Sequence, residues 1–191
     1  MNERLCLQAV EGLKKRGFEA VFVKTGAEAA EIVMKEAETA QSVGWGGSET
    51  VKGLGLREKL VAAGKEVRDH QLVMDLFLLS ANALTADGRI VNIDGNGNRV
   101  AASICGPKRV IYLIGRNKIV DGGIDAAIAR IKTFACPPNC RGLGKKTPCA
   151  LTGVCGDCDS PDRICKVTAV FDRKPTGVSA KVIVIDEDLG Y

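Results

Sequence analysis

The sequence has few aromatic residues and a single histidine. Phe, Trp and Tyr together make up 4% of its 191 residues, so an aromatic platform for stacking the bases of single-stranded nucleic acid is not expected. The net charge of +4 is mild, and no basic stripe predicts contacts with nucleic-acid phosphates. His70 lies beside Asp69, a pattern more typical of a surface residue than of a catalytic base.

Long apolar segments are also absent. No stretch approaches the ~20 apolar residues that a membrane-spanning helix needs, and the charged N-terminal segment 1–17 lacks the apolar core of a signal peptide. We therefore expect a soluble, cytoplasmic protein without a membrane span. In a reducing compartment its eight cysteines predict thiols or metal ligands rather than a disulfide framework.

Strands and helices alternate along the chain. The near-continuous apolar runs 72–80 and 109–115 are typical of strands buried on both faces of a sheet. Further strands are predicted at 18–23, 42–45, 166–171 and 181–185, with a short extended segment from Val67, and helices at 3–16, 27–40, 54–63 and 124–134. This order predicts one α/β domain over residues 1–191, with a mainly parallel sheet flanked by helices.

A glycine-rich segment, 42–53, joins a predicted strand to a predicted helix. Its candidate ligand-binding residues are Gly46, Gly47, Ser48 and Thr50. Glycines allow close approach to the backbone and hydroxyls add donors, a combination that suits a phosphate or a carboxylate. The segment is neither a P-loop nor a dinucleotide fingerprint, because Glu49 stands where the third glycine of the fingerprint would be. A tight turn without a ligand is the equal alternative.

Residues 80–99 are dense in Asn, Asp and Gly. Asp87-Gly88 predicts a hairpin turn between Leu84 and Ile90. The candidate ligand-binding residues here are Asn82, Asp94, Asn98 and Arg99. Since α/β sheets bind ligands at the carboxyl ends of their strands, we expect these side chains to share a pocket for a small anionic metabolite with the glycine loop. Turn formation alone also favours these residue types. Arg116 and Lys118 add two cations to the same edge.

Six cysteines fall within the stretch 136–165, which is predicted to be a long irregular, metal-binding insertion. The expected ligands are Cys149, Cys155, Cys158 and Cys165, spaced C-x5-C-x2-C-x6-C, with Cys136 and Cys140 in reserve. Thiolates bind zinc and iron, and a C-x2-C pair presents two sulfurs from one turn. The uneven spacing leans toward an iron–sulfur cluster over zinc; unligated thiols and a redox-active Cys155–Cys158 disulfide are the alternatives. Cys6 and Cys105, in apolar contexts, are expected in the core.

Four segments resemble the LUD, or lactate-utilisation, family. They are GGSET (46–50), SANALTADGRIVNIDGNGNRVAA (80–102), GPKRVIYLIGRNKIV (106–120) and AIARIKTFACPPN (127–139). The resemblance implies a fold similar to the superfamily of ribose-phosphate isomerase, glucosamine-phosphate deaminase and CoA-transferase. It also implies work in a multi-protein system that oxidises lactate to pyruvate, alongside iron–sulfur and oxidoreductase subunits.

The chain departs from this family in two ways. It lacks the C-x2-C-x2-C-x3-C-P runs of the larger iron–sulfur subunit, so it resembles the small lactate-utilisation protein C subunit with an added cysteine-rich tail. No glutamate occurs between Glu66 and Glu187, which leaves Glu49 as the chief candidate for a CoA-transferase nucleophile and disfavours that mechanism.

Two functions are therefore predicted. The first is an accessory or electron-transfer subunit in the oxidation of lactate to pyruvate, carrying a cysteine-ligated metal or iron–sulfur site. The second is an independent enzyme or ligand-binding protein that acts on a phosphorylated or carboxylate metabolite and holds a structural zinc.

Overall fold

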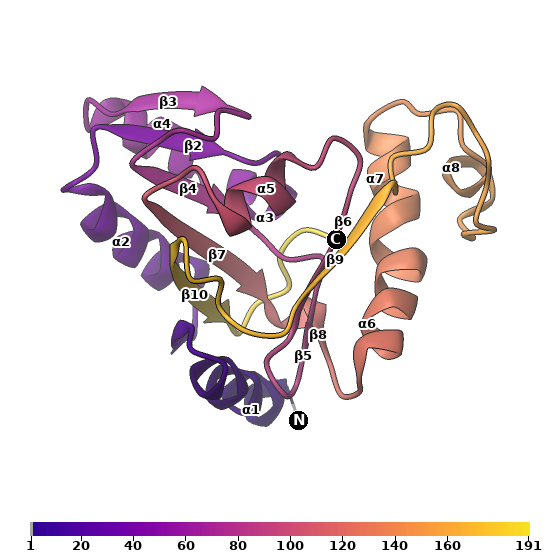
Figure 1. Ribbon diagram of the computed structural model, residues 1–191, viewed down its shortest axis with the longest axis horizontal. Coiled ribbons are helices and arrows are strands. Elements are labelled where there is room, and N and C mark those ends of the chain that lie inside the picture. The colour runs from indigo at the N-terminus through magenta and orange to yellow at the C-terminus, as the bar shows by residue number, and fades with distance from the viewer. Residues whose placement is uncertain (1) are drawn as a thin grey trace.

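The computed structural model describes residues 2–191 and contains two sheets (Figure 1). The larger sheet has six strands in the order β1-β10-β7-β4-β2-β3, and every neighbouring pair is parallel. Its strands are β1 (Glu19–Val23), β2 (Ser42–Trp45), β3 (Glu66–Asp69), β4 (Leu76–Leu79), β7 (Arg109–Gly115) and β10 (Ser179–Ile185). The predicted α/β fold with a mainly parallel sheet is confirmed.

The central strands are buried on both faces because their side chains alternate between them. On one face Leu78, Ile111 and Ile183 belong to a core that is covered by three helices. These are α2 (Gly26–Ala37), α3 (Glu49–Gly53) and α4 (Leu56–Ala62). The helix expected at 54–63 begins only at Leu56, because Gly55, with φ +60°, separates it from α3.

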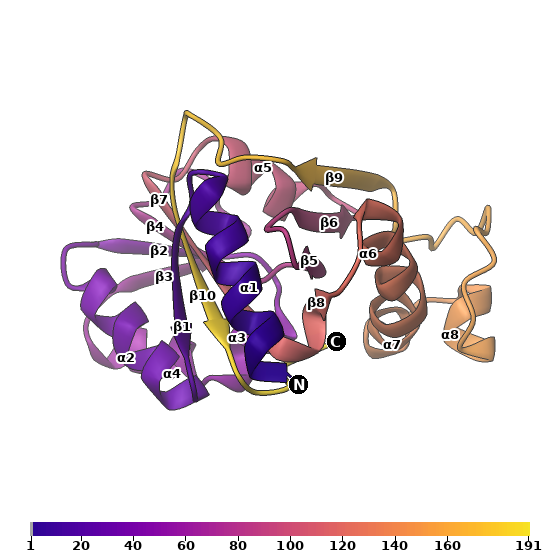
Figure 2. The ribbon, with the colours of Figure 1, turned by 90° about the horizontal axis from the view of Figure 1, so that it is seen from below.

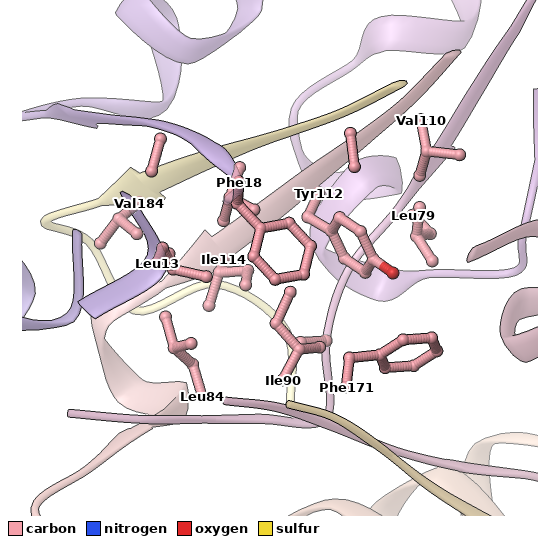
Figure 3. Close-up of a cluster of buried hydrophobic side chains, with 14 of the residues drawn as sticks. Leu13, Phe18, Leu79, Leu84, Ile90, Val110, Tyr112, Ile114, Phe171 and Val184 are labelled. Atoms are coloured by element: carbon pink, nitrogen blue, oxygen red, sulfur yellow. The ribbon is translucent and has the colours of Figure 1, made fainter. Parts of the chain in front are cut away.

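The opposite face packs against α1 (Asn2–Lys15), α5 (Asn98–Ile104) and a second sheet that the sequence did not predict. This sheet has the order β8-β5-β6-β9 and mixes parallel and antiparallel pairs. Its strands are β8 (Ile119–Val120), β5 (Ala83–Thr85), β6 (Ile90–Asp94) and β9 (Val167–Phe171). Figure 3 shows Ile90 and Phe171 of this sheet beside Tyr112 of the larger one. The predicted hairpin is confirmed, since Leu84 pairs antiparallel with Ile90.

A helical column covers the outer face of the second sheet. It consists of α6 (Ile124–Arg130), the π-helix η2 (Ile131–Ala135) and α7 (Cys136–Gly142), and runs without interruption (Figure 1). The short helix α8 (Pro148–Thr152) lies outside the column (Figure 2). The irregular loop expected from Cys136 onward is therefore wrong in its first half. The prolines of α7 directly follow the π-helix η2, and the proline of α8 lies in its first turn, where an N–H has no partner within its own helix.

Two smaller expectations also need correction. The strand expected at 72–80 is only β4, because residues 72–75 bend before it. Cys6 is buried as expected, but Cys105 is exposed, because α5 ends there and Gly106, with φ +112°, redirects the chain. No helix within residues 2–191 has both the length and the apolar character to cross a membrane.

Candidate functional site

The carboxyl ends of β2, β4 and β7 meet at one edge of the parallel sheet, and a cavity of about 550 Å³ opens there. One wall is formed by the segments that follow β2, β4 and β6, and the opposite wall by η2, α7 and the cysteine-rich segment before β9. This is the edge at which α/β sheets bind ligands.

Seven of the eight predicted ligand-binding residues line this cavity: Gly46, Gly47, Ser48, Asn82, Asp94, Asn98 and Arg99. The eighth, Thr50, is buried behind it and contacts a cavity-lining side chain, Lys118. The structure thus brings these residues together, and their binding of a ligand stays a prediction.

Much of the glycine loop has a packing explanation. A Cβ atom on Gly46 would lie 2.9 Å from both the Phe77 ring and the Arg99 side chain, so only glycine lets them pack against this backbone. Gly47 has φ +50°, a conformation that glycine adopts without strain. Ser48 Oγ accepts a hydrogen bond from Val51 N at 3.3 Å and so caps the short helix α3. The Ser48 hydroxyl is thus already engaged in a turn.

Asp94 and Arg99 both line the cavity and form a largely buried ion pair, with a nitrogen–oxygen distance of 2.7 Å. The Asp94 carboxylate also accepts from the backbone N–H groups of Arg99 and Val100, both at 3.1 Å, and so fixes the start of α5. Arg99 Nη2 donates in addition to Ile93 O at 2.9 Å and to Asn82 Oδ1 at 3.3 Å. The positive charge of Arg99 is therefore already balanced by Asp94.

His70, expected at the surface, is exposed but reaches the mouth of the cavity. Asn98 Nδ2 lies 2.7 Å from His70 Nδ1, so the two side chains are hydrogen-bonded. His70 has φ +58°, which is rare for a residue with a side chain. The pair joins the chain after β3 to the first turn of α5.

Lys118 is the most unusual ionisable group at this edge. Its side chain is buried, with 4% of the residue exposed, and its ammonium nitrogen donates to Thr50 Oγ1 at 2.7 Å and to Ser80 Oγ at 3.0 Å. Burial, reinforced by the charges of Arg130 and Arg99, lowers the pKa of Lys118 to about 7. Arg116, the other cation predicted here, instead pairs with acidic residues of the C-terminal segment.

Arg130 is a second cation without an acidic partner. Its guanidinium donates to Asn82 O at 2.9 Å and to Asn117 O at 3.0 Å, and burial lowers its pKa. Within residues 2–191 the hydrogen-bond partners of Lys118 and Arg130 are hydroxyl and carbonyl oxygens only. An uncompensated positive charge therefore lies behind the cavity. Sequence reasoning missed Arg130 and Ser80, because no local pattern separates them from ordinary helix and strand-end residues.

The cysteines gather on the far side of the same cavity, which Cys136 and Cys165 line. The Sγ atoms of the buried pair Cys140 and Cys149 lie 3.8 Å apart. Burial, and then the nearby thiols of Cys165, Cys155, Cys140 and Cys149, raises the pKa of Cys136 to about 12. Over the described part of the chain, no three His, Cys, Asp or Glu side chains are arranged to hold a metal ion. The set Cys149, Cys155, Cys158 and Cys165 stays a prediction.

The LUD domain pattern matches residues 6–185. The chain belongs to the LUD domain family. A similar solved structure is the crystal structure of a DUF162 family protein from Deinococcus radiodurans, with a TM-score of 0.57 and 14% sequence identity over 97% of this chain and 98% of that one. This likeness supports the fold of the LUD domain alone. No curated protein matches the chain. The narrower resemblance to a lactate-utilisation protein C subunit stays a prediction.

Proposed function

We propose that this LUD domain binds a small anionic metabolite, a carboxylate such as lactate or a phosphorylated compound, in the cavity at the carboxyl edge of its parallel sheet. It would do so as an accessory subunit of a lactate-oxidising system, beside partner subunits that carry iron–sulfur clusters and the oxidoreductase chemistry. Membership of the LUD family supports the lactate-utilisation setting.

The uncompensated charge of Lys118 and Arg130 carries this proposal. A buried cation without a counter-ion is costly, and Asp94 cannot supply one because it already pairs with Arg99. A carboxylate or phosphate in the cavity would balance the charge and accept hydrogen bonds from the groups that line it. The volume of about 550 Å³ falls in the range of small-molecule sites.

Calorimetric titration of the purified chain with lactate and with inorganic phosphate tests the site. We expect Lys118→Met to weaken binding at least about tenfold, since it removes a buried charge. Lys59→Met is the matched control, because Lys59 is exposed on α4, away from the cavity. Anion binding that neither Lys118→Met nor Ser48→Ala changes would overturn the proposal and leave the glycine loop as a turn.

We further propose that the cysteine-rich segment holds a metal, either zinc or the iron of a cluster, because the Cys140–Cys149 distance fits two thiolates on one tetrahedral metal ion. Two thiolates about 2.3 Å from one tetrahedral zinc lie about 3.8 Å apart, which is the separation of this pair. Cys155, Cys158 and Cys165, from the segment that follows α8, would complete the site.

Metal analysis of anaerobically purified protein separates the two centres. One zinc per chain in a colourless sample, lost in a Cys140→Ser, Cys149→Ser double variant, would support zinc. A brown sample containing iron, with absorption in the visible range, would overturn zinc in favour of the electron-transfer function. A metal-free chain would refute both centres.

A further inference from the structure

We propose that Lys118 is a nucleophile that condenses with the aldehyde or ketone carbonyl of a small anionic ligand to form an imine. The inference rests on the proposed function, since the ligand is held by the same anion-binding cavity. It goes further in assigning a covalent step to one named atom, Nζ of Lys118.

The hydrogen bonds around Lys118 suit a neutral amine. Thr50 Oγ1 donates to Leu189 O at 3.0 Å and Ser80 Oγ donates to Ala81 O at 3.3 Å. Both hydroxyl protons are thereby committed to backbone carbonyls, so each oxygen acts as an acceptor toward Nζ. A neutral amine has two hydrogens, and these two oxygens accept both. Its lone pair then occupies the remaining direction, where no partner exists within residues 2–191.

The electrostatic setting also favours the neutral amine. Proteins activate lysine nucleophiles by removing them from water and by placing other cations nearby. Lys118 has both features, because it is buried and the charges of Arg130 and Arg99 act on it. Its pKa of about 7 leaves a large share of the amine unprotonated near neutral pH.

The ligand must combine a carbonyl group with an anionic group. The cavity contains Lys118 on the sheet side, and Lys145, Arg163 and Lys166 on the cysteine-rich side. An anionic group facing these cations would leave the other end of a small molecule beside Nζ. A 2-oxo carboxylate and a phosphorylated sugar in its open aldehyde form share this chemistry.

The step is balanced without an oxidant or a reductant. The Nζ lone pair forms a bond to the carbonyl carbon, and the carbonyl oxygen takes a proton to give a carbinolamine. The C–O bond then breaks, the hydroxyl leaves as water, and Nζ loses its second proton as the C=N bond forms. The two protons that Nζ loses are the two that leave with the carbonyl oxygen as water, so the step balances without a further acid or base.

Borohydride trapping tests the proposal, because it reduces an imine to a stable secondary amine. The whole chain would be incubated with pyruvate, or in a separate arm with glyceraldehyde 3-phosphate, then reduced and mapped by peptide mass spectrometry. We expect Lys118 to gain the mass of one ligand less one oxygen, well above the labelling of exposed lysines such as Lys59. Comparing the rates of labelling by pyruvate and by glyceraldehyde 3-phosphate shows whether the site prefers a 2-oxo carboxylate or a phosphorylated sugar. Excess phosphate should protect Lys118 but not Lys59.

Lys118→Arg keeps a cation but removes the nucleophile, so it should abolish the adduct. The unfolding midpoint of this variant is measured alongside to check that it is folded. Protection of Lys118 by phosphate in the unmodified chain tests, without any variant, whether the adduct forms in the cavity. Binding of lactate by calorimetry with no adduct at Lys118 would overturn this inference and leave the proposed function intact. Equal labelling of Lys118 and Lys59 would also overturn it. Absence of any anion binding would overturn the proposed function itself.

Discussion

The burial of Lys118 predicts that replacing it will stabilise the chain, and more so at low pH. Because its pKa in the folded chain, about 7, lies below its ordinary value of 10.5, the unfolded chain binds more protons between these two pH values. The contribution of Lys118 to stability therefore rises as the pH increases from about 7 to about 10.5. It is most unfavourable below pH 7, where both states are protonated and the full cost of burying the charge applies.

The magnitude follows from the two pKa values. At about 1.4 kcal/mol per pH unit, their separation corresponds to a destabilisation of about 5 kcal/mol at low pH. Lys118→Met removes the charge and keeps most of the side-chain length, so the variant escapes this cost. The free energy of unfolding of the variant minus that of the unmodified chain should fall by about 4 kcal/mol between about pH 6 and about pH 10.

Urea unfolding across this pH range, in a buffer whose ions do not occupy the cavity, measures the effect. Taking the difference between the two chains cancels every other titrating group that they share. Lys59→Met is the control and should show no pH-dependent difference. A Lys118→Met difference that stays constant from pH 6 to pH 10 would refute the depressed pKa, and with it the electrostatic support for a neutral amine. Saturating lactate should reduce the difference near pH 7, because a bound anion favours the protonated lysine.

Three further outcomes are expected. Asp94→Ala should lower the free energy of unfolding, measured in urea, by about 3–5 kcal/mol, because it leaves the Arg99 charge buried without its partner. A decrease below about 1 kcal/mol would mean that the pair contributes no more than an exposed salt bridge. Gly12→Ala should destabilise the chain by about 1–3 kcal/mol or more, since its Cβ would lie 2.4 Å from the backbone carbon of Asp87. Gly53→Ala, with open space around it, should be neutral or stabilising, and equal effects of the two substitutions would contradict the packing of α1. The isolated chain should produce no NADH from lactate and NAD⁺, because it lacks a dinucleotide fingerprint, whereas adding the partner subunits should give turnover; steady NADH production by the chain alone would contradict the accessory role.

The parallel sheet and the edge at which the cavity opens were predictable because their signals are local. Apolar runs of strand length mark β7 and β4, and polar residues directly after strands mark the edge where a ligand would sit. Lys118 was also visible as a cation at a strand end, but its burial was not. That burial depends on Thr50 and Ser80, which follow two other strands and meet Lys118 only in three dimensions.

The cysteine-rich segment was harder to predict because prolines and glycines obscure its helices. The stretch 136–165 was predicted to be irregular, yet Pro137 and Pro138 lie within α7, directly after η2. The ligand set was chosen from spacing alone, whereas the shortest sulfur–sulfur contact involves Cys140, which spacing had placed in reserve. Spacing reports which sulfurs can come from one turn, and it does not report which helices pack together.

The pairing of β6 with β9 explains why the cysteines and the predicted ligand-binding residues share a cavity. Asp94 pairs with Val167 in antiparallel register, and Lys166 N donates to Asp94 O at 2.9 Å. Cys165 therefore arrives beside the loop that begins at Asp94. A Cβ atom on Gly95 would lie 2.8 Å from Ile164 O, so a glycine is needed for this approach. A slip of one residue in the register would turn the β9 side chains to the opposite face of the sheet and shift Cys165 relative to the cavity wall. Register in this small second sheet, rather than the spacing of the cysteines, thus sets the distance between the thiols and the site that contains Lys118.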